Sequence, residues 1–117
     1  MAAPNVVNVT TIYGKTAVQA VGVSATAVVS NAAASGTLVK VNAIYISNID
    51  TAAAYKITVD FYRSTTAYNI VYQVSIPVGA AMDVLSKAIY LEEGDTLRLT
   101  ADTASKLQAV ASYEVIS

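Results

Sequence analysis

The acidic side chains are the part of this sequence best suited to chemistry, because few other reactive groups are present. Glu92, Glu93 and Asp95 surround Gly94 in one predicted turn, and carboxylate oxygens are the ligands that hard cations prefer. A calcium ion takes about six to eight oxygen ligands, more than one acidic turn supplies. An exposed hairpin turn with solvated charges is therefore the simpler interpretation.

Asp60 and Asp83 are a second possibility, as an acid–base pair of the kind that cleaves glycosidic bonds. Such a pair requires a fixed separation between the two carboxyl groups, and nothing in the sequence sets that separation. The chain also has no tryptophan on which a sugar ring would stack. We interpret both residues as solvated charges on strand faces.

Gly14-Lys15-Thr16 matches the end of a phosphate-binding loop. That loop also needs a glycine five positions before its Gly-Lys pair, where this sequence has Val9, and a helix after it. No helical pattern follows, so we interpret the segment as a turn with a solvated lysine.

Histidine and cysteine are both absent from the sequence. Most hydrolytic, redox and zinc chemistry uses imidazole or thiolate as base, nucleophile or ligand. We therefore expect a protein that is not an enzyme and that has no cofactor and no metal.

The composition favours one folded domain that contacts other protein. The chain has 117 residues, of which 55% are hydrophobic and 13% charged, and so sparse a charged surface indicates partial coverage by a partner. Its net charge is −1 and its basic residues are scattered, so we expect no nucleic-acid binding, which needs clustered lysine and arginine. Polar residues interrupt the charge-free run 16–39, and no signal-peptide pattern precedes it. We expect no membrane association.

Alternation of apolar and polar residues predicts short strands at 55–62, 68–76, 96–101 and 107–116. Leu38–Ser47 is apolar on both faces, which is typical of a central strand or of one covered by a partner, and 82–91 is similarly mixed. In 68–76 we expect four side chains to point inward: Ile70, Tyr72, Val74 and Ile76.

Turn residues separate these runs, as at Arg63–Thr66, Pro77–Gly79 and Glu92–Asp95, where Gly94 suits a positive φ. The spacing of alanines and Leu107 over 101–111 also fits a helix, and we expect at most one helical turn there. The predicted fold is all-β. It is one antiparallel β-sandwich over residues 1–117, with about eight strands, either jelly-roll-like or immunoglobulin-like.

Two groups of residues are candidate interaction surfaces. Residues 1–30 alternate only weakly, which predicts either edge strands or an extended arm onto a neighbouring subunit, and a Val-rich unpaired edge needs a cover. Tyrosine is enriched at interfaces, although β-propensity explains it equally well. The candidate interface residues are Val6, Val9, Ile12 and Tyr13 in the first region, and Tyr62, Arg63 and Tyr68 around one predicted turn.

The C-terminal two thirds carry a pattern that resembles a known group of proteins. Residues 87–95, Lys-Ala-Ile-Tyr-Leu-Glu-Glu-Gly-Asp, are followed by Leu97, Leu107 and Ser112-Tyr113-Glu114, and Ile44-Tyr45-Ile46-Ser47-Asn48 comes earlier. Over about residues 40–117 this resembles small virion structural proteins of tailed bacteriophages, particularly those that infect cyanobacteria. The resemblance implies a strand-turn-strand of a β-sandwich and a virion role, and it points to no functional site.

From the resemblance we expect a cement protein that decorates and stabilises the capsid. Its partners would be the major capsid protein and further copies of itself, most simply in a trimer, and it would lie on the capsid surface after assembly in the host cytoplasm. A neck, collar or tail ring component is the first alternative. A small module that binds glycans or a host surface is the second, suggested by the tyrosines around the Arg63–Tyr68 turn.

Overall fold

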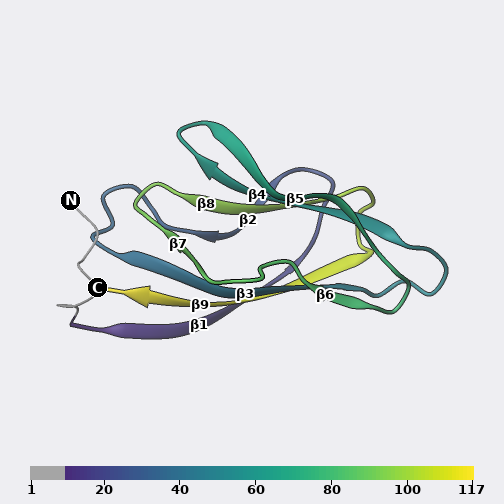
Figure 1. The fold of residues 1–117 in the computed structure, drawn as a ribbon, viewed down its shortest axis with the longest axis horizontal. Helices are drawn as coiled ribbons and strands as arrows, with labels where there is room; N and C mark the ends of the chain where they lie inside the picture. Colours follow the sequence, from purple (N-terminus) through teal and green to yellow (C-terminus); the bar gives the residue numbers. More distant parts are fainter. Residues whose placement is uncertain (1–9) are drawn as a thin grey trace.

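The structure, a computed structural model, describes residues 10–117, which form nine β-strands (Figure 1). Within that range the chain contains no helix, and the helical spacing over 101–111 is realised as strand, turn and strand. The strands are β1 (Ile12–Ala20), β2 (Thr26–Ser30), β3 (Leu38–Asn48), β4 (Tyr55–Arg63), β5 (Thr66–Ile76), β6 (Ala81–Asp83), β7 (Ile89–Leu91), β8 (Thr96–Ala101) and β9 (Leu107–Ile116).

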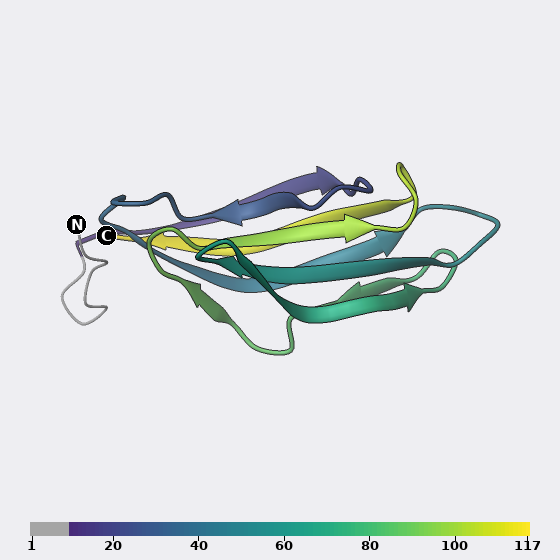
Figure 2. The same cartoon turned by 90° about the horizontal axis from the view of Figure 1, so that it is seen from above.

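The strands form a sandwich of two antiparallel sheets (Figure 1). Sheet A has the order β1-β9-β3-β6, and β7 also pairs with β3. Sheet B has the order β2-β8-β4-β5. Seen from above, β1 and β2 lie along one side of the sandwich, and β5, β6 and β7 lie along the other (Figure 2). The predicted all-β sandwich is confirmed.

The pairing order identifies the sandwich as a jelly roll. The innermost hairpin is β4–β5, and around it come the pairs β3 with β6 and β7, β2 with β8, and β1 with β9. Successive pairs alternate between the two sheets, as when one long hairpin is rolled up. An immunoglobulin-like sandwich would place the first strand beside the second in one sheet, whereas β1 lies beside the last strand, β9.

The hydrophobic core lies between the two sheets and follows the predicted alternation. On β8, Leu97 and Leu99 are fully buried while Arg98 and Thr100 are only partly buried, as expected. The central position predicted for Leu38–Ser47 is also confirmed, because β3 pairs with β9 on one side and with β6 and β7 on the other. Each fully buried leucine or isoleucine contributes about 1.5–3 kcal/mol.

The alternation predicted for β5 is wrong in its middle. Tyr72 is 64% exposed, whereas Val71, expected on the outer face, pairs with the inward residue Val59. The β4–β5 register shifts on both sides of Val59, and Gln73 has a φ of 50°. Each bulge adds a residue and moves the following side chains to the other face, which a strict period of two does not anticipate.

Two buried asparagines attach loops to the strands through side-chain hydrogen bonds. Asn48 is 2% exposed. Its Nδ2 donates to the carbonyl oxygens of Ala53 and Ile76 at 2.9 and 3.0 Å, and its Oδ1 accepts from the Asp50 amide at 2.9 Å. The side chain thus ties the β3–β4 loop to the end of β5.

Asn31, in the loop between β2 and β3, connects that loop to the end of β7. It is 3% exposed, and its Nδ2 donates to the carbonyl oxygens of Thr37 and Leu91, both at 2.9 Å. Its Oδ1 accepts from the hydroxyl groups of Ser35 and Thr37. These bonds satisfy buried backbone carbonyls that would otherwise lose their water.

The two-residue turn of the β4–β5 hairpin is strained, which gives a first testable prediction. Ser64 and Thr65 have φ angles of 51° and 63°, values that a type I′ turn requires and that asparagine and glycine adopt most easily. The double change Ser64→Asn with Thr65→Gly is expected to raise the free energy of unfolding by about 1–2 kcal/mol, measured by urea denaturation. The control change Thr66→Gly lies in β5 and should lower it by about 0.5–1 kcal/mol. A turn variant no more stable than the native chain would contradict the assignment.

Candidate functional site

The acidic side chains of the turn after β7 bind to other groups of the same chain. The guanidinium group of Arg63 holds both carboxylate oxygens of Asp95, with Nε to Oδ1 at 2.8 Å and Nη2 to Oδ2 at 2.5 Å, and it also reaches Glu92 at 2.7 Å. Glu93 accepts a hydrogen bond from the Gly36 amide at 2.8 Å. Arg63 is the counterion of this turn, and Gly94 has the expected positive φ, 91°.

The electrostatics of two carboxylates agree with a structural role. The Arg63 guanidinium holds the pKa of Asp95 below its usual value, against the opposing effect of burial. At the other end of the sandwich, the Lys106 ammonium group, helped by the Tyr55 hydroxyl, lowers the pKa of Asp50 to about 2. A general acid needs a raised pKa, so neither group is suited to donate a proton at neutral pH.

The other residues considered for catalysis are not brought together. Asp60 lies in sheet B and forms an ion pair with Arg98, Nε to Oδ1 at 2.9 Å, whereas Asp83 lies in β6 of sheet A and accepts a hydrogen bond from the Leu85 amide. Gly14-Lys15-Thr16 lies inside β1 and not in a turn, which rules out a phosphate-binding loop at that position. Among residues 10–117 no three acidic side chains form a cluster able to hold a metal ion.

The turn candidates are divided between the two faces of the β4–β5 hairpin. Tyr68 pairs with Phe61, whose face packs on the core, whereas Tyr62 pairs with Ala67 on the opposite face. The Tyr62 ring is covered by the Arg98 guanidinium, 3.9 Å from its centroid. Tyr68 is 59% exposed. The two tyrosines therefore do not form one aromatic platform for a sugar.

The N-terminal candidates are only partly described. Val6 and Val9 lie outside the described residues. Ile12 and Tyr13 begin β1, where they pair with Ile116 and Val115 of β9, and both are more than half exposed. Of the two alternatives for residues 1–30, the described part consists of the edge strands β1 and β2.

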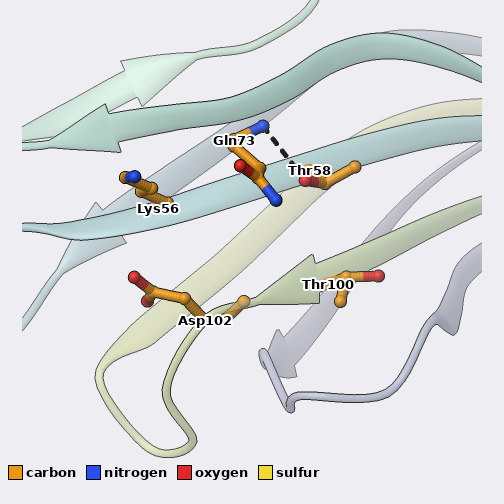
Figure 3. Close-up of a pocket in the computed structure, with 6 residues that line it drawn as sticks. Lys56, Thr58, Gln73, Thr100 and Asp102 are labelled. Carbon is orange, nitrogen blue, oxygen red and sulfur yellow. Dashed lines mark hydrogen bonds between the residues drawn. The ribbon is translucent and has the colours of Figure 1, made fainter.

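Two of the depressions on the surface of the described residues differ in character. One, on sheet B, is lined mostly by polar residues, namely Lys56, Thr58, Gln73, Thr100 and Asp102, and the backbone amide of Gln73 donates to the Thr58 hydroxyl at 3.1 Å (Figure 3). Its volume, about 230 Å³, is below the range of about 300–1,000 Å³ typical of ligand sites. The other, of about 490 Å³, is an apolar groove between β5 and the β6–β7 segment, and Phe61, Ile70 and Met82 contribute to its wall.

An uncharged apolar row crosses the outer face of sheet A. Val18 on β1 pairs with Val110 on β9, which pairs in turn with Tyr45 on β3, so the three side chains share one face. They are 75%, 41% and 50% exposed. Its members come from three strands far apart along the chain, so no local sequence pattern reveals the row.

Comparisons with known proteins bear on the fold. No family model matches the sequence, and no curated protein does. One solved structure similar to this chain comes from Bacillus endospore appendages, described as a novel family of disulfide-linked pili. It has 12% sequence identity and a TM-score of 0.52, over 91% of this chain and 85% of that one. At this identity the likeness supports the sandwich architecture.

In the described part of the chain, the structure has no helix with the length and apolar character needed to cross a membrane.

Proposed function

We propose that this chain is a non-enzymatic structural subunit that coats the capsid of a tailed bacteriophage in many copies. The observation that carries the proposal is the apolar row of Val18, Val110 and Tyr45, on a sheet face with few charges. Large side chains exposed in a continuous group mark protein–protein contact surfaces, and tyrosine is enriched there. The virion setting itself rests on the sequence resemblance described above.

The ion pairs of the described residues are consistent with a structural role. The carboxylates of Asp50, Asp60 and Asp95 are each paired with a cation of the same chain, so they serve to hold the sandwich together. A protein that binds only the assembled shell stabilises that shell by mass action, by about 2.7 kcal/mol per site at a free concentration of 100 times Kd.

A subunit of an extracellular filament is the second candidate, favoured by the similarity to the Bacillus appendage structure. The sequence contains no cysteine, so the disulfide linkage named for those pili has no counterpart in this chain. A filament built from it would depend on non-covalent contacts alone.

The copy number of the chain in purified virions tests the proposal, measured by quantitative mass spectrometry against the major capsid protein. A ratio near one, or a fixed fraction of the shell lattice, is expected for a capsid coat. A few copies per particle would instead assign the chain to a neck, collar or tail ring. Absence from virions would overturn the proposal, and filaments formed by the purified chain would then favour the second candidate.

A further inference from the structure

The outer edge of β1 carries a regular row of unpaired backbone groups. Thr11 and Ser117 exchange two backbone hydrogen bonds of 2.9 Å, and the Val21 amide donates to Leu107. Because hydrogen-bonded pairs alternate in an antiparallel ladder, the odd-numbered residues of β1 bond to β9. The N–H and C=O groups directed away from β9, where no described strand lies, belong to Ile12, Gly14, Thr16, Val18 and Ala20.

The other sheet edges are interrupted, as edges usually are in proteins that avoid pairing with further strands. On sheet B, β2 has five residues and a register shift, and β5 has two register shifts. On sheet A, β6 and β7 have three residues each. In contrast, β1 pairs with β9 over nine residues without a shift, contains no proline and has one charge, Lys15.

Among residues 10–117, little covers either face of the space beside β1. Tyr13 shares its face with Ala17, which packs on the core, yet Tyr13 is 60% exposed and Lys15 is also exposed. Sheet B therefore does not cover this half of β1. On the outer face, a side chain placed at Gly14 would meet no atom within 4 Å. A strand approaching this edge meets little obstruction.

We propose that the β1 edge binds β1 of a second copy of this chain, in antiparallel register about a two-fold axis. An exposed strand edge can be extended by another strand, and β1 is the only long uninterrupted edge that the described residues offer. In a two-fold contact the same edge serves both copies. Sheet A then continues through the contact, and the partner's own row of Val18, Val110 and Tyr45 lies on the same face of the extended sheet.

The residues of β1 select one register. The free groups belong to even-numbered residues, so only registers that pair even with even complete the ladder. The one that overlaps all nine residues pairs Thr16 with the partner's Thr16 and Val18 with the partner's Gly14. It also places Lys15 opposite the partner's Ala17. A shift by one step toward the N-terminus would place Lys15 opposite the partner's Lys15, and like charges directly opposite are destabilising.

This contact goes beyond the proposed function, because coating a surface does not itself require copies to join edge to edge. It also proposes a two-fold pair in place of the trimer expected from the resemblance. Capsid binding and the β1 contact can therefore fail separately: the first is tested in virions and the second with the purified chain.

Cysteine crosslinking of the full chain tests the register. The chain has no cysteine of its own, so a single introduced thiol gives a clean signal. Directly opposed residues of a hydrogen-bonded pair have Cα atoms about 5.5 Å apart, within disulfide range. Oxidised Thr16→Cys should form at least about tenfold more covalent dimer than Val18→Cys, whose two thiols would lie about 13 Å apart along the strands. Equal crosslinking of both variants, or none in either, would overturn the proposal.

A charge exchange at the same position gives an independent test. Thr16→Lys and Thr16→Glu each place like charges opposite one another across the axis. Each variant alone should dimerise at least about tenfold more weakly than the native chain in sedimentation velocity. An equimolar mixture of the two should recover the dimer. A native chain that stays monomeric or forms trimers, or a mixture that does not recover, would contradict the two-fold contact. Recovery in the mixture would also show that both variants are folded.

Discussion

Replacing Asn48 with alanine is expected to lower the free energy of unfolding by about 2–4 kcal/mol. The side chain is 2% exposed, and its loss removes the partners of two carbonyl groups, at Ala53 and Ile76, and of the Asp50 amide. Each buried polar group left without a partner costs about 1–3 kcal/mol. Water that enters the site can bond to some of these groups, so the total loss is smaller than the sum of the separate costs. Urea denaturation monitored by tyrosine fluorescence would measure the change.

Two further variants separate this effect from a general loss of asparagine. Asn69→Ala removes an exposed asparagine of β5, and its effect should stay within about 0.5 kcal/mol. Asn48→Asp keeps the shape but turns an acceptor oxygen toward two carbonyl oxygens, so at neutral pH it should destabilise at least as much as alanine. If Asn48→Ala behaved like Asn69→Ala, the bonds to Ala53 and Ile76 would not contribute to stability.

The sequence predicts the strands well because burial between two sheets imposes a local pattern. Leu97 and Leu99 alternate with polar residues, and the structure buries them as the period of two requires. The pattern fails where the backbone departs from a regular strand. The bulges of β5 change the face of Tyr72, and no residue type in that stretch marks them, since Gln73 takes the positive φ where glycine would be expected.

Contacts between distant segments leave no local pattern in the sequence. Asn31 bonds to the carbonyl of Leu91, and nothing in the sequence around Asn31 indicates such a partner. The choice between a jelly roll and an immunoglobulin-like sandwich also depends on which strands pair, and alternation within each strand is the same in both.

The candidate interaction surfaces likewise include residues that the sequence indicates and residues that only the fold brings together. Ile12 and Tyr13, selected from the sequence, lie on the regular edge strand β1. The row of Val18, Val110 and Tyr45 was missed, because it exists only once three strands are placed side by side. Arg63, selected as an interface residue, is instead bound to Asp95 within the same chain, and its role at an interface stays a prediction.

The pair of Arg63 and Asp95 leads to the second large effect, a loss of stability that depends on pH. Arg63→Ala is expected to lower the free energy of unfolding by about 2 kcal/mol at pH 7, because Asp95 is 3% exposed and would keep only the Glu92 amide as a donor. Breaking a fully buried pair costs about 3–5 kcal/mol. Arg63 is 45% exposed, so solvent screening reduces the expected value.

The pH dependence follows from the pKa of Asp95, which Arg63 lowers in the folded state. The stability that the pair contributes is present above the carboxyl pKa of the unfolded chain, about 3.9, and is lost as the pH falls through the folded-state value. The difference in free energy of unfolding between the native chain and Arg63→Ala should therefore be largest at pH 7 and should become smaller below about pH 4. Urea denaturation at pH 7 and at a pH below about 4 would measure it. Arg63→Lys keeps the charge but not the bidentate geometry, so its free energy of unfolding at pH 7 should lie between those of the native chain and Arg63→Ala. A difference of equal size at both pH values would instead assign the loss to packing of Arg63 on the Phe61 ring, 5.1 Å from its centroid.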